Sequence, residues 1–274
     1  MILITGHEGF IGGAVKADFD SLGIPTMGWE KGRYGKKRDC TFDWEYSLSR
    51  INREDRIKAI IHIGADSSTT NRDYEEVYFL NVITTDRLSW FCYNESIPFI
   101  YSSSAATYGD ANGNLNFYGF TKKLAERKVV QRGQLALRYF NVYGPGESHK
   151  GDMASVAYKA YQKKLKGEKQ ILFPGSPRRD FVFIDDVVYA NFHAFRNYKN
   201  LRGKAYEVGS GQARSFEDMM NILGVDYEVS ETNPLLSNGY QNFTESKKDM
   251  WMPGWTPQYS LEWGLEKYRR FLQL

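Results

Sequence analysis

Cysteine is scarce in this sequence, with two among 274 residues. Cys40 and Cys92 form no metal-binding or redox pattern, so we predict no metal site and expect both to be reduced side chains that pack in the core. The longest apolar runs have only the length of a strand, which excludes a transmembrane helix, and residues 1–5 lack the basic start and cleavage site of a signal peptide. These absences predict a cytoplasmic protein without a membrane partner.

The sequence also lacks a strong excess of charge of either sign. Its formal net charge is +3, with 25% charged and 42% hydrophobic residues, which is an ordinary composition for a soluble enzyme and predicts no nucleic-acid partner. We find no repeat and no low-complexity segment. The length suits one large α/β domain, or such a domain with a small cap.

A glycine-rich turn follows the apolar strand that we expect at residues 1–5. Gly6, Gly9 and Gly12 stand three residues apart, and an amphipathic helix is expected after them. In a dinucleotide-binding turn, the first glycine permits the tight bend, the second lets the backbone approach a pyrophosphate, and the third lets the helix pack closely. An incidental glycine-rich turn is the alternative, but the flanking strand and helix favour cofactor binding.

The choice of cofactor depends on the end of the second strand, expected at 24–28. Proteins that bind NAD usually carry an acid at this position to hold the ribose diol. Here Glu30 is close, but it is followed by a basic run that includes Lys31 and Arg33. The basic run favours the 2′-phosphate of NADP, whereas Glu30 keeps NAD as the alternative. A solvated charged loop would also explain the run.

The candidate catalytic residues lie in the stretch 102–122. A buried strand expected at 98–101 leads into serines that end at Ser104, and a helix is expected at 118–131. Tyr118 and Lys122 are four residues apart and so share one face of that helix. A phenol has a pKa of about 10, but a nearby cation favours the phenolate and a serine hydroxyl can share its proton. This trio can therefore move a proton on and off a carbinol oxygen.

Strand and helix patterns alternate as far as residue 146, which predicts a Rossmann-type, doubly wound parallel sheet in an α/β fold. We expect residues 1–146 to bind the dinucleotide and residues 147–274 to form a smaller, mainly substrate-binding α/β part, with room for some segments to return to the core. His62 stands in an apolar strand and is predicted to be a core histidine. Arg178 and Arg179 could clamp a diphosphate, or form surface salt bridges with Asp180 or Asp185.

Several longer segments of the sequence resemble those of a known protein family. They lie at 64–70, 103–109, 138–145, 149–155 and 179–182. With the glycine-rich turn and Tyr118-x-x-x-Lys122, they resemble the extended short-chain dehydrogenase/reductase superfamily. Within it, the sequence is most similar to the ADP-L-glycero-D-manno-heptose 6-epimerase family, over nearly the whole chain. The element His149-Lys150-Gly151 is the part most particular to that family.

The resemblance implies a nucleotide-sugar epimerase that oxidises C6 of an ADP-heptose transiently and returns the hydride to the other face. Tyr118 and Lys150 would be its two acid/base residues, Ser104 would bond the reacting oxygen, and Lys122 would hold the nicotinamide ribose. The cofactor would also contact Phe10, Ile11, Ala65, Asp66, Ser67, Asn81 and Val142. The substrate would contact Ser104, Asn141, Asp152, Lys159, Phe173, Pro174, Gly175, Ser176, Arg179 and Tyr240.

The sequence departs from this family in several places. Asp152 and Lys159 stand where members usually carry Ser and His, and the segment between Tyr108 and Tyr118 is short. Another nucleotide-sugar 4-epimerase or reductase is thus an alternative, whereas a dehydratase is disfavoured because Ala105-Ala106 replace its usual Asp-Glu pair. A non-catalytic dinucleotide sensor is the alternative from another class. We expect a homo-oligomer.

Overall fold

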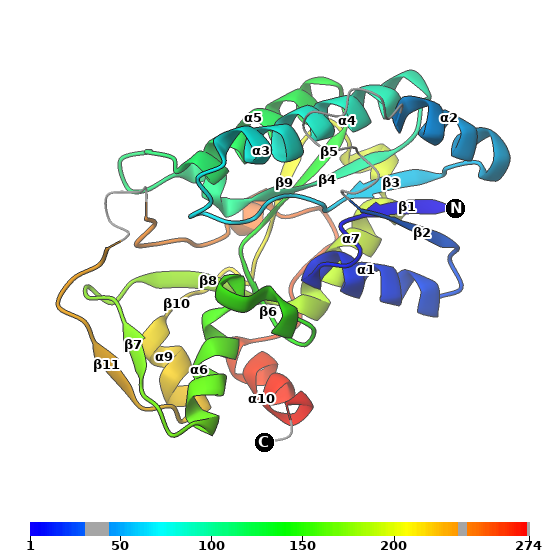
Figure 1. The fold of residues 1–274 in the computed structure, drawn as a ribbon. Helices are drawn as coiled ribbons and strands as arrows, with labels where there is room; N and C mark the ends of the chain where they lie inside the picture. The colour runs from blue at the N-terminus through cyan, green and yellow to red at the C-terminus, as the bar shows by residue number, and fades with distance from the viewer. Residues whose placement is uncertain (31–43, 235–239, 273–274) are drawn as a thin grey trace.

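A parallel sheet runs through the larger lobe of the protein (Figure 1). The computed structural model describes residues 1–30, 44–234 and 240–272, and within them this sheet has six strands in the order β2-β1-β3-β4-β5-β9. The chain leaves β1 for β2 on one side and then reaches β3 on the other, so a ligand crevice is expected at the carboxyl ends of these strands. The predicted Rossmann-type fold is confirmed. The strands are β1 (Ile2–Thr5), β2 (Thr26–Trp29), β3 (Ala59–His62), β4 (Phe99–Ser104), β5 (Leu135–Tyr139) and β9 (Ala205–Val208).

Helices cover both faces of this sheet (Figure 1). Side chains of a strand alternate between the faces, so Ile2 and Ile4 pack in one apolar cluster with Phe19 of the first helix, whereas Leu3 packs in another with Leu88. Cys92 is buried in the second cluster as an unpaired thiol, as predicted, and Cys40 lies outside the described residues. The first face is covered by α1 (Phe10–Ser21) and α7 (Ile184–Arg196), the second by α2 (Trp44–Asp55), α4 (Thr84–Asn94) and α5 (Phe117–Gln131).

The long helical segment between β3 and β4 is interrupted by a π turn. It consists of α3 (Tyr74–Tyr78), the π turn η2 (Phe79–Ile83) and α4. Asn81 lies in that turn and its side chain is buried. Turns of this kind inside α-helices often accompany functional sites. In the described ranges, no helix is long and apolar enough to cross a bilayer.

The smaller lobe holds two short sheets and several helices (Figure 1). Because β9 and α7 return to the larger lobe, the chain beyond residue 146 contributes to both lobes. One short sheet joins β10 (Ala213–Ser215), β8 (Arg178–Phe183) and β6 (Asn141–Tyr143), and the other joins β11 (Tyr227–Val229) to β7 (Gln170–Leu172). The α-helices of this lobe are α6 (Val156–Leu165), α9 (Phe216–Leu223) and α10 (Leu261–Phe271), whereas α8 (Tyr198–Leu201) contacts the larger lobe, where its Tyr198 hydroxyl accepts the Phe99 N–H.

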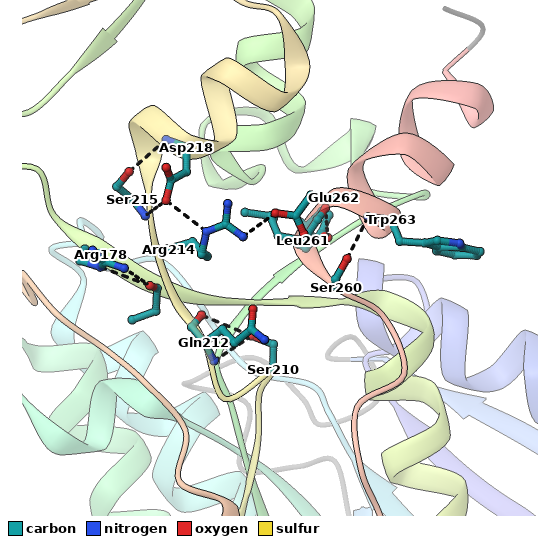
Figure 2. A network of polar contacts seen from close by, with 12 residues as sticks. Arg178, Ser210, Gln212, Arg214, Ser215, Asp218, Ser260, Leu261, Glu262 and Trp263 are labelled. Carbon is teal, nitrogen blue, oxygen red and sulfur yellow. Dashed lines mark hydrogen bonds and ion pairs between the residues drawn. The ribbon is translucent and has the colours of Figure 1, made fainter.

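Arg214 connects two of these helices (Figure 2). Its Nε donates to Asp218 of α9 at 3.1 Å, and its Nη1 donates to Glu262 of α10 at 2.6 Å. Ser215 and Asp218 form a reciprocal capping box at the start of α9, and Ser260 caps α10. The last helix is thereby fixed beside α9 and the sheet that contains β10, although it is distant from them in sequence.

Candidate active site

A cavity of about 780 Å³ opens at the carboxyl ends of β1, β4 and β5. Most of the predicted cofactor and catalytic residues line it, although they come from distant parts of the chain. Glu30, Ser103 and Phe140 also line it and were not among the predicted site residues. The predicted residues present are Gly6, Gly9, Phe10, Ile11, Gly12, Ala65, Asp66, Ser67, Ser104, Tyr118, Lys122, Asn141, Val142 and Lys150.

The glycine-rich turn fits the diphosphate of a dinucleotide. Gly6 has a φ of +69°, and a Cβ on it would lie 2.6 Å from the Gly64 nitrogen. A Cβ on Gly12 would lie 2.1 Å from the carbonyl oxygen of Gly6. In the described chain no side chain caps α1 at Gly9, so the positive end of this helix faces the cavity.

Glu30 follows β2 directly and lines the same cavity. Its Oε1 accepts the Glu8 N–H at 2.8 Å and lies 3.1 Å from Nδ1 of His7. The imidazole of His7 packs against Gly28, where a Cβ would approach it to 2.2 Å. The carboxylate of Glu30 is therefore held beside the glycine-rich turn. Lys31 and Arg33, which suggested NADP, lie outside the described residues.

Asn81 holds the loop after β3 from behind and does not line the cavity, unlike its predicted role as a direct cofactor contact. Its amide oxygen accepts the Asp66 N–H at 2.8 Å, and its amide nitrogen donates to the Asp66 carbonyl at 2.9 Å and to Thr121 at 3.1 Å. It therefore fixes the position of Ala65–Ser67, which do line the cavity.

His62 is a core histidine, as predicted. Its Nδ1 hydrogen bonds Thr5 Oγ1 at 2.7 Å and its Nε2 hydrogen bonds Thr85 Oγ1 at 2.9 Å. Burial, reinforced by the charge of Lys122, lowers the His62 pKa to about 3, so the ring is neutral near pH 7. Thr5 also accepts the N–H groups of Ile63 and Gly64, so this cluster shapes the loop that lies against Gly6.

Tyr118 and Ser104 meet at the floor of the cavity. Burial raises the Tyr118 pKa, a hydrogen bond with Ser104 opposes that effect, and the Asp66 charge adds to it. Lys122 is only 2% exposed, and burial lowers its pKa to about 7 although Glu126 acts against this. Its Nζ lies 4.4 Å from the centre of the Tyr101 ring. In the described chain no carboxylate forms an ion pair with it, so its ammonium can bind hydroxyl groups of a ligand.

Lys150 reaches the cavity from the loop between β6 and α6. Its Nζ lies 5.1 Å from the centre of the Phe10 ring at the start of α1. Burial lowers its pKa, Glu147 raises it, and Lys159 lowers it further. A lysine with a lowered pKa can accept and donate a proton near neutral pH.

A second cavity of about 1030 Å³ continues from the first and shares Ser104, Tyr118 and Asn141 with it. Arg179 lines this cavity, is 6% exposed, and places its guanidinium carbon 4.8 Å from the centre of the Tyr240 ring. In the part of the chain that the structure describes, no carboxylate pairs with it. Other predicted substrate residues that line this cavity are Lys159, Phe173 and Tyr240.

The two adjacent arginines have different environments. Arg178 donates from Nη2 to the Ala213 carbonyl at 2.7 Å and so supports the sheet, whereas Arg179 lines the cavity. The predicted salt-bridge alternative is wrong, because Asp180 accepts hydrogen bonds from Ser210, Gly211 and Ser246, and Asp185 pairs with Lys267. Adjacent residues of a strand point to opposite faces.

Several predicted substrate residues lie elsewhere. Pro174, Gly175 and Ser176 form the turn after β7 and do not line either cavity; Ser176 donates to Glu217 at 3.1 Å. The side chain of Asp152 lies outside the described part.

The second cavity is also lined by residues that the sequence analysis missed. Phe216, the first residue of α9, lines it, and the Arg179 guanidinium carbon lies 5.9 Å from the centre of its ring. Gln241 donates to the carbonyls of Ala105 and Gly109 at 3.1 and 2.9 Å. The capping pattern at Ser215 could have located the start of α9, but no local signal distinguishes Gln241.

Known proteins share this architecture. The model of the NAD dependent epimerase/dehydratase family matches residues 2–209. The ADP-L-glycero-D-manno-heptose-6-epimerase of Brachyspira hyodysenteriae is 32% identical, over 100% of this chain and 98% of its own length.

Among solved structures, the ADP-L-glycero-D-manno-heptose-6-epimerase of Helicobacter pylori has a TM-score of 0.81 at 25% identity and covers 99% of this chain and 95% of its own. The UDP-glucose 4-epimerase of Thermotoga maritima, solved with UDP-glucose, has a TM-score of 0.78 at 24% identity and covers 99% of both chains; this likeness concerns the fold alone. The family match, the full-length relative and the arrangement of Ser104, Tyr118 and Lys122 agree, and the chain belongs to the NAD-dependent epimerase/dehydratase family of the extended short-chain dehydrogenase/reductase superfamily.

Proposed function

We propose that this protein is a nucleotide-sugar epimerase that interconverts ADP-D-glycero-D-manno-heptose and ADP-L-glycero-D-manno-heptose at C6. One observation carries the proposal: two candidate acid/base residues, Tyr118 and Lys150, line one cavity from different elements. An epimerase needs such a group on each face of its sugar, whereas a simple dehydrogenase needs one. The full-length likeness to the Brachyspira hyodysenteriae enzyme supports the heptose as substrate.

Tyr118 is the proposed acid/base on the first face. Ser104 hydrogen bonds its phenol and so favours the phenolate, which burial disfavours. The same serine can bond the reacting oxygen and align it with the phenol. Lys122 would bind ribose hydroxyls of the cofactor and place a positive charge one helical turn from Tyr118. The bound dinucleotide supplies a reversible hydride acceptor.

Lys150 is the proposed acid/base on the second face. Burial lowers its pKa below the ordinary value of a lysine and so favours the neutral amine, the form that can take a proton from the sugar hydroxyl. A binding lysine that only neutralises phosphate would have no need of burial beside Phe10.

The nucleotide diphosphate would bind in the second cavity, against Arg179. This guanidinium is buried against the Tyr240 ring, and no carboxylate of the described residues pairs with it. A diphosphate would therefore supply its negatively charged partner. Lys159 adds positive charge to the same cavity. We propose that residues 1–146 mainly bind the dinucleotide and that 147–274 mainly bind the substrate. Homo-oligomer formation stays a prediction.

We infer that the dinucleotide is NAD, which revises the preference for NADP drawn from Lys31 and Arg33. Glu30 lines the cavity at the end of β2, where a carboxylate can hydrogen bond the ribose hydroxyls of NAD and repels the 2′-phosphate of NADP. Equilibrium titration with both dinucleotides tests this inference. Glu30→Ala should weaken NAD about tenfold and strengthen NADP, with the exposed neighbour Glu8→Ala as the matched control. Tighter binding of NADP by the unaltered protein would overturn it.

NMR of the purified protein with ADP-D-glycero-D-manno-heptose, cofactor and no added reductant tests the reaction itself. Appearance of the L-glycero epimer with no net change in cofactor is the expected result. Lys150→Met should slow this epimerisation about 100-fold. A protein that binds the dinucleotide but leaves the heptose unchanged would contradict the proposed substrate and direct the search to other nucleotide sugars. Net oxidation of NADH or NADPH would instead identify a reductase.

A further inference from the structure

Glu147 is a buried carboxylate without a part in the proposed proton transfers. It is 0% exposed and lies on the loop between β6 and α6, three residues before Lys150. Its Oε2 accepts the Ser155 N–H at 2.5 Å, and its Oε1 accepts the Ser155 hydroxyl at 2.7 Å. Oε1 also accepts the Tyr268 hydroxyl of α10 at 3.0 Å and the Gly144 N–H at 3.3 Å. This one side chain therefore closes the loop at both ends and ties it to the last helix.

The same residue also fixes the backbone of Lys150. The Lys150 N–H donates to the Glu147 carbonyl at 3.0 Å. Ser155, whose N–H and hydroxyl both bond the Glu147 carboxylate, caps α6 by accepting the Tyr158 N–H. A neutral or shorter side chain at position 147 would leave buried donors without an acceptor, which is costly in a protein interior.

The charge of Glu147 also affects the protonation of the Lys150 amine. Burial of Lys150 favours its neutral form, the Glu147 carboxylate favours the ammonium, and Lys159 from α6 opposes it. From α1, the ring of Phe10 faces the amine. From α10, Tyr268 faces Glu147, and burial together with this carboxylate raises the Tyr268 pKa, so the phenol stays neutral.

We propose that Glu147 is the positioning residue of Lys150: its carboxylate anchors the loop from 144 to 155 to α10 and places a buried negative charge on the loop that carries the amine. The inference rests on the acid/base role proposed above for Lys150. The C-terminal helix α10 would then contribute to the reaction, because its Tyr268 hydroxyl donates to the Glu147 carboxylate, which in turn anchors the loop that carries Lys150.

Glu147→Gln tests this proposal, because it keeps the shape and removes the charge. We expect kcat to fall about 30- to 100-fold while the dissociation constant of the cofactor changes less than about threefold. The second readout is the pH dependence of acetylation of Lys150 by acetic anhydride, followed by peptide mass spectrometry. Its midpoint should move to lower pH by about half a unit or more, because the charge that favours the ammonium is gone.

Glu266→Gln is the matched control, since it removes a half-buried carboxylate, paired with Arg269, from the same helix as Tyr268 and should change neither readout. If Glu147→Gln lowered kcat but left the midpoint of Lys150 acetylation unchanged, Glu147 would have a purely structural role and the proposal would be overturned. An unchanged kcat would also overturn it. If the unaltered protein does not epimerise the heptose, the proposed function fails, and the acetylation midpoint still decides whether Glu147 acts on Lys150. If Glu147→Gln does not fold, Tyr268→Phe replaces it as the test. This variant keeps the Glu147 charge but removes the hydroxyl that holds it, so kcat should fall while the midpoint of Lys150 acetylation stays unchanged. An unchanged kcat would show that the contact with α10 does not position Lys150.

Discussion

The two sides of the cleft are built in different ways. The dinucleotide side consists of short loops that directly follow strands β1, β2 and β3, and much of its shape comes from backbone at Gly6, Gly12 and Gly64. The proposed substrate side gathers single side chains such as Lys159, Arg179 and Tyr240 from separate segments of the chain. A site shaped mainly by backbone is specified by nearby residues in the sequence. A site made of separate side chains forms only after distant segments of the chain have packed together.

The charges differ as well. On the substrate side Arg179 is buried in the described chain without a carboxylate partner, so a diphosphate can replace the water that it loses. On the dinucleotide side Glu30 and Asp66 add negative charge, and the start of α1 supplies a partial positive charge. The two ends of the cleft therefore select for different ligand groups, and Tyr118 lies where they meet.

The largest effect is expected at Tyr118, one of the residues that line both cavities. Tyr118→Phe removes the proton-transfer group and leaves the ring, so turnover should fall about 10³-fold or more while cofactor binding stays nearly unchanged. Steady-state kinetics and a dinucleotide titration on the same preparation measure both. Turnover at the rate of the unaltered enzyme would show that the chemistry lies elsewhere.

One added methyl group should disrupt the glycine-rich turn, because its shape comes from closely packed backbone. Gly12→Ala places a Cβ 2.1 Å from the Gly6 oxygen, so we expect unfolding to become easier by about 3 kcal/mol and dinucleotide binding to be lost. Gly13→Ala, in the same helix, is the control, because its Cβ meets only the His7 oxygen at 3.2 Å and alanine favours a helix. Urea denaturation measures both, and equal stability of the two variants would contradict the close packing.

This contrast also explains what could be predicted from the sequence. The glycine spacing, the strand that holds His62 and the pair Tyr118 and Lys122 all depend on neighbours within a few residues, and the structure brings them to the carboxyl edge of the sheet. The sequence could not tell that Asn81 turns inward at a π turn to hold a loop. Nor could it locate Gln241, whose partners are more than a hundred residues away.

The pair Arg178 and Arg179 tests the substrate side. Arg179→Lys keeps the charge but loses the planar group that rests on Tyr240, so KM for the nucleotide sugar should rise about 30- to 100-fold with a smaller change in kcat. Arg178→Lys is the control, because Arg178 bonds the Ala213 carbonyl and does not line the cavity. Initial rates at varied nucleotide-sugar concentration measure both KM values. A larger increase in KM for Arg178→Lys than for Arg179→Lys would contradict the role of Arg179 in binding the nucleotide sugar.

The smallest effect concerns stability on the dinucleotide side. His62 has a folded-state pKa of about 3 because it is buried, whereas an unfolded histidine has about 6.5, so the unfolded chain binds the extra proton as the pH falls. The contribution of this histidine is therefore present above pH 6.5 and is lost progressively towards pH 3, amounting to about 2 kcal/mol between pH 7 and pH 5. Urea denaturation at both pH values should show that His62→Gln loses less stability between pH 7 and pH 5 than the unaltered protein does. If the pH dependence of His62→Gln matched that of the unaltered chain, the buried cluster with Thr5 and Thr85 would not hold the ring neutral.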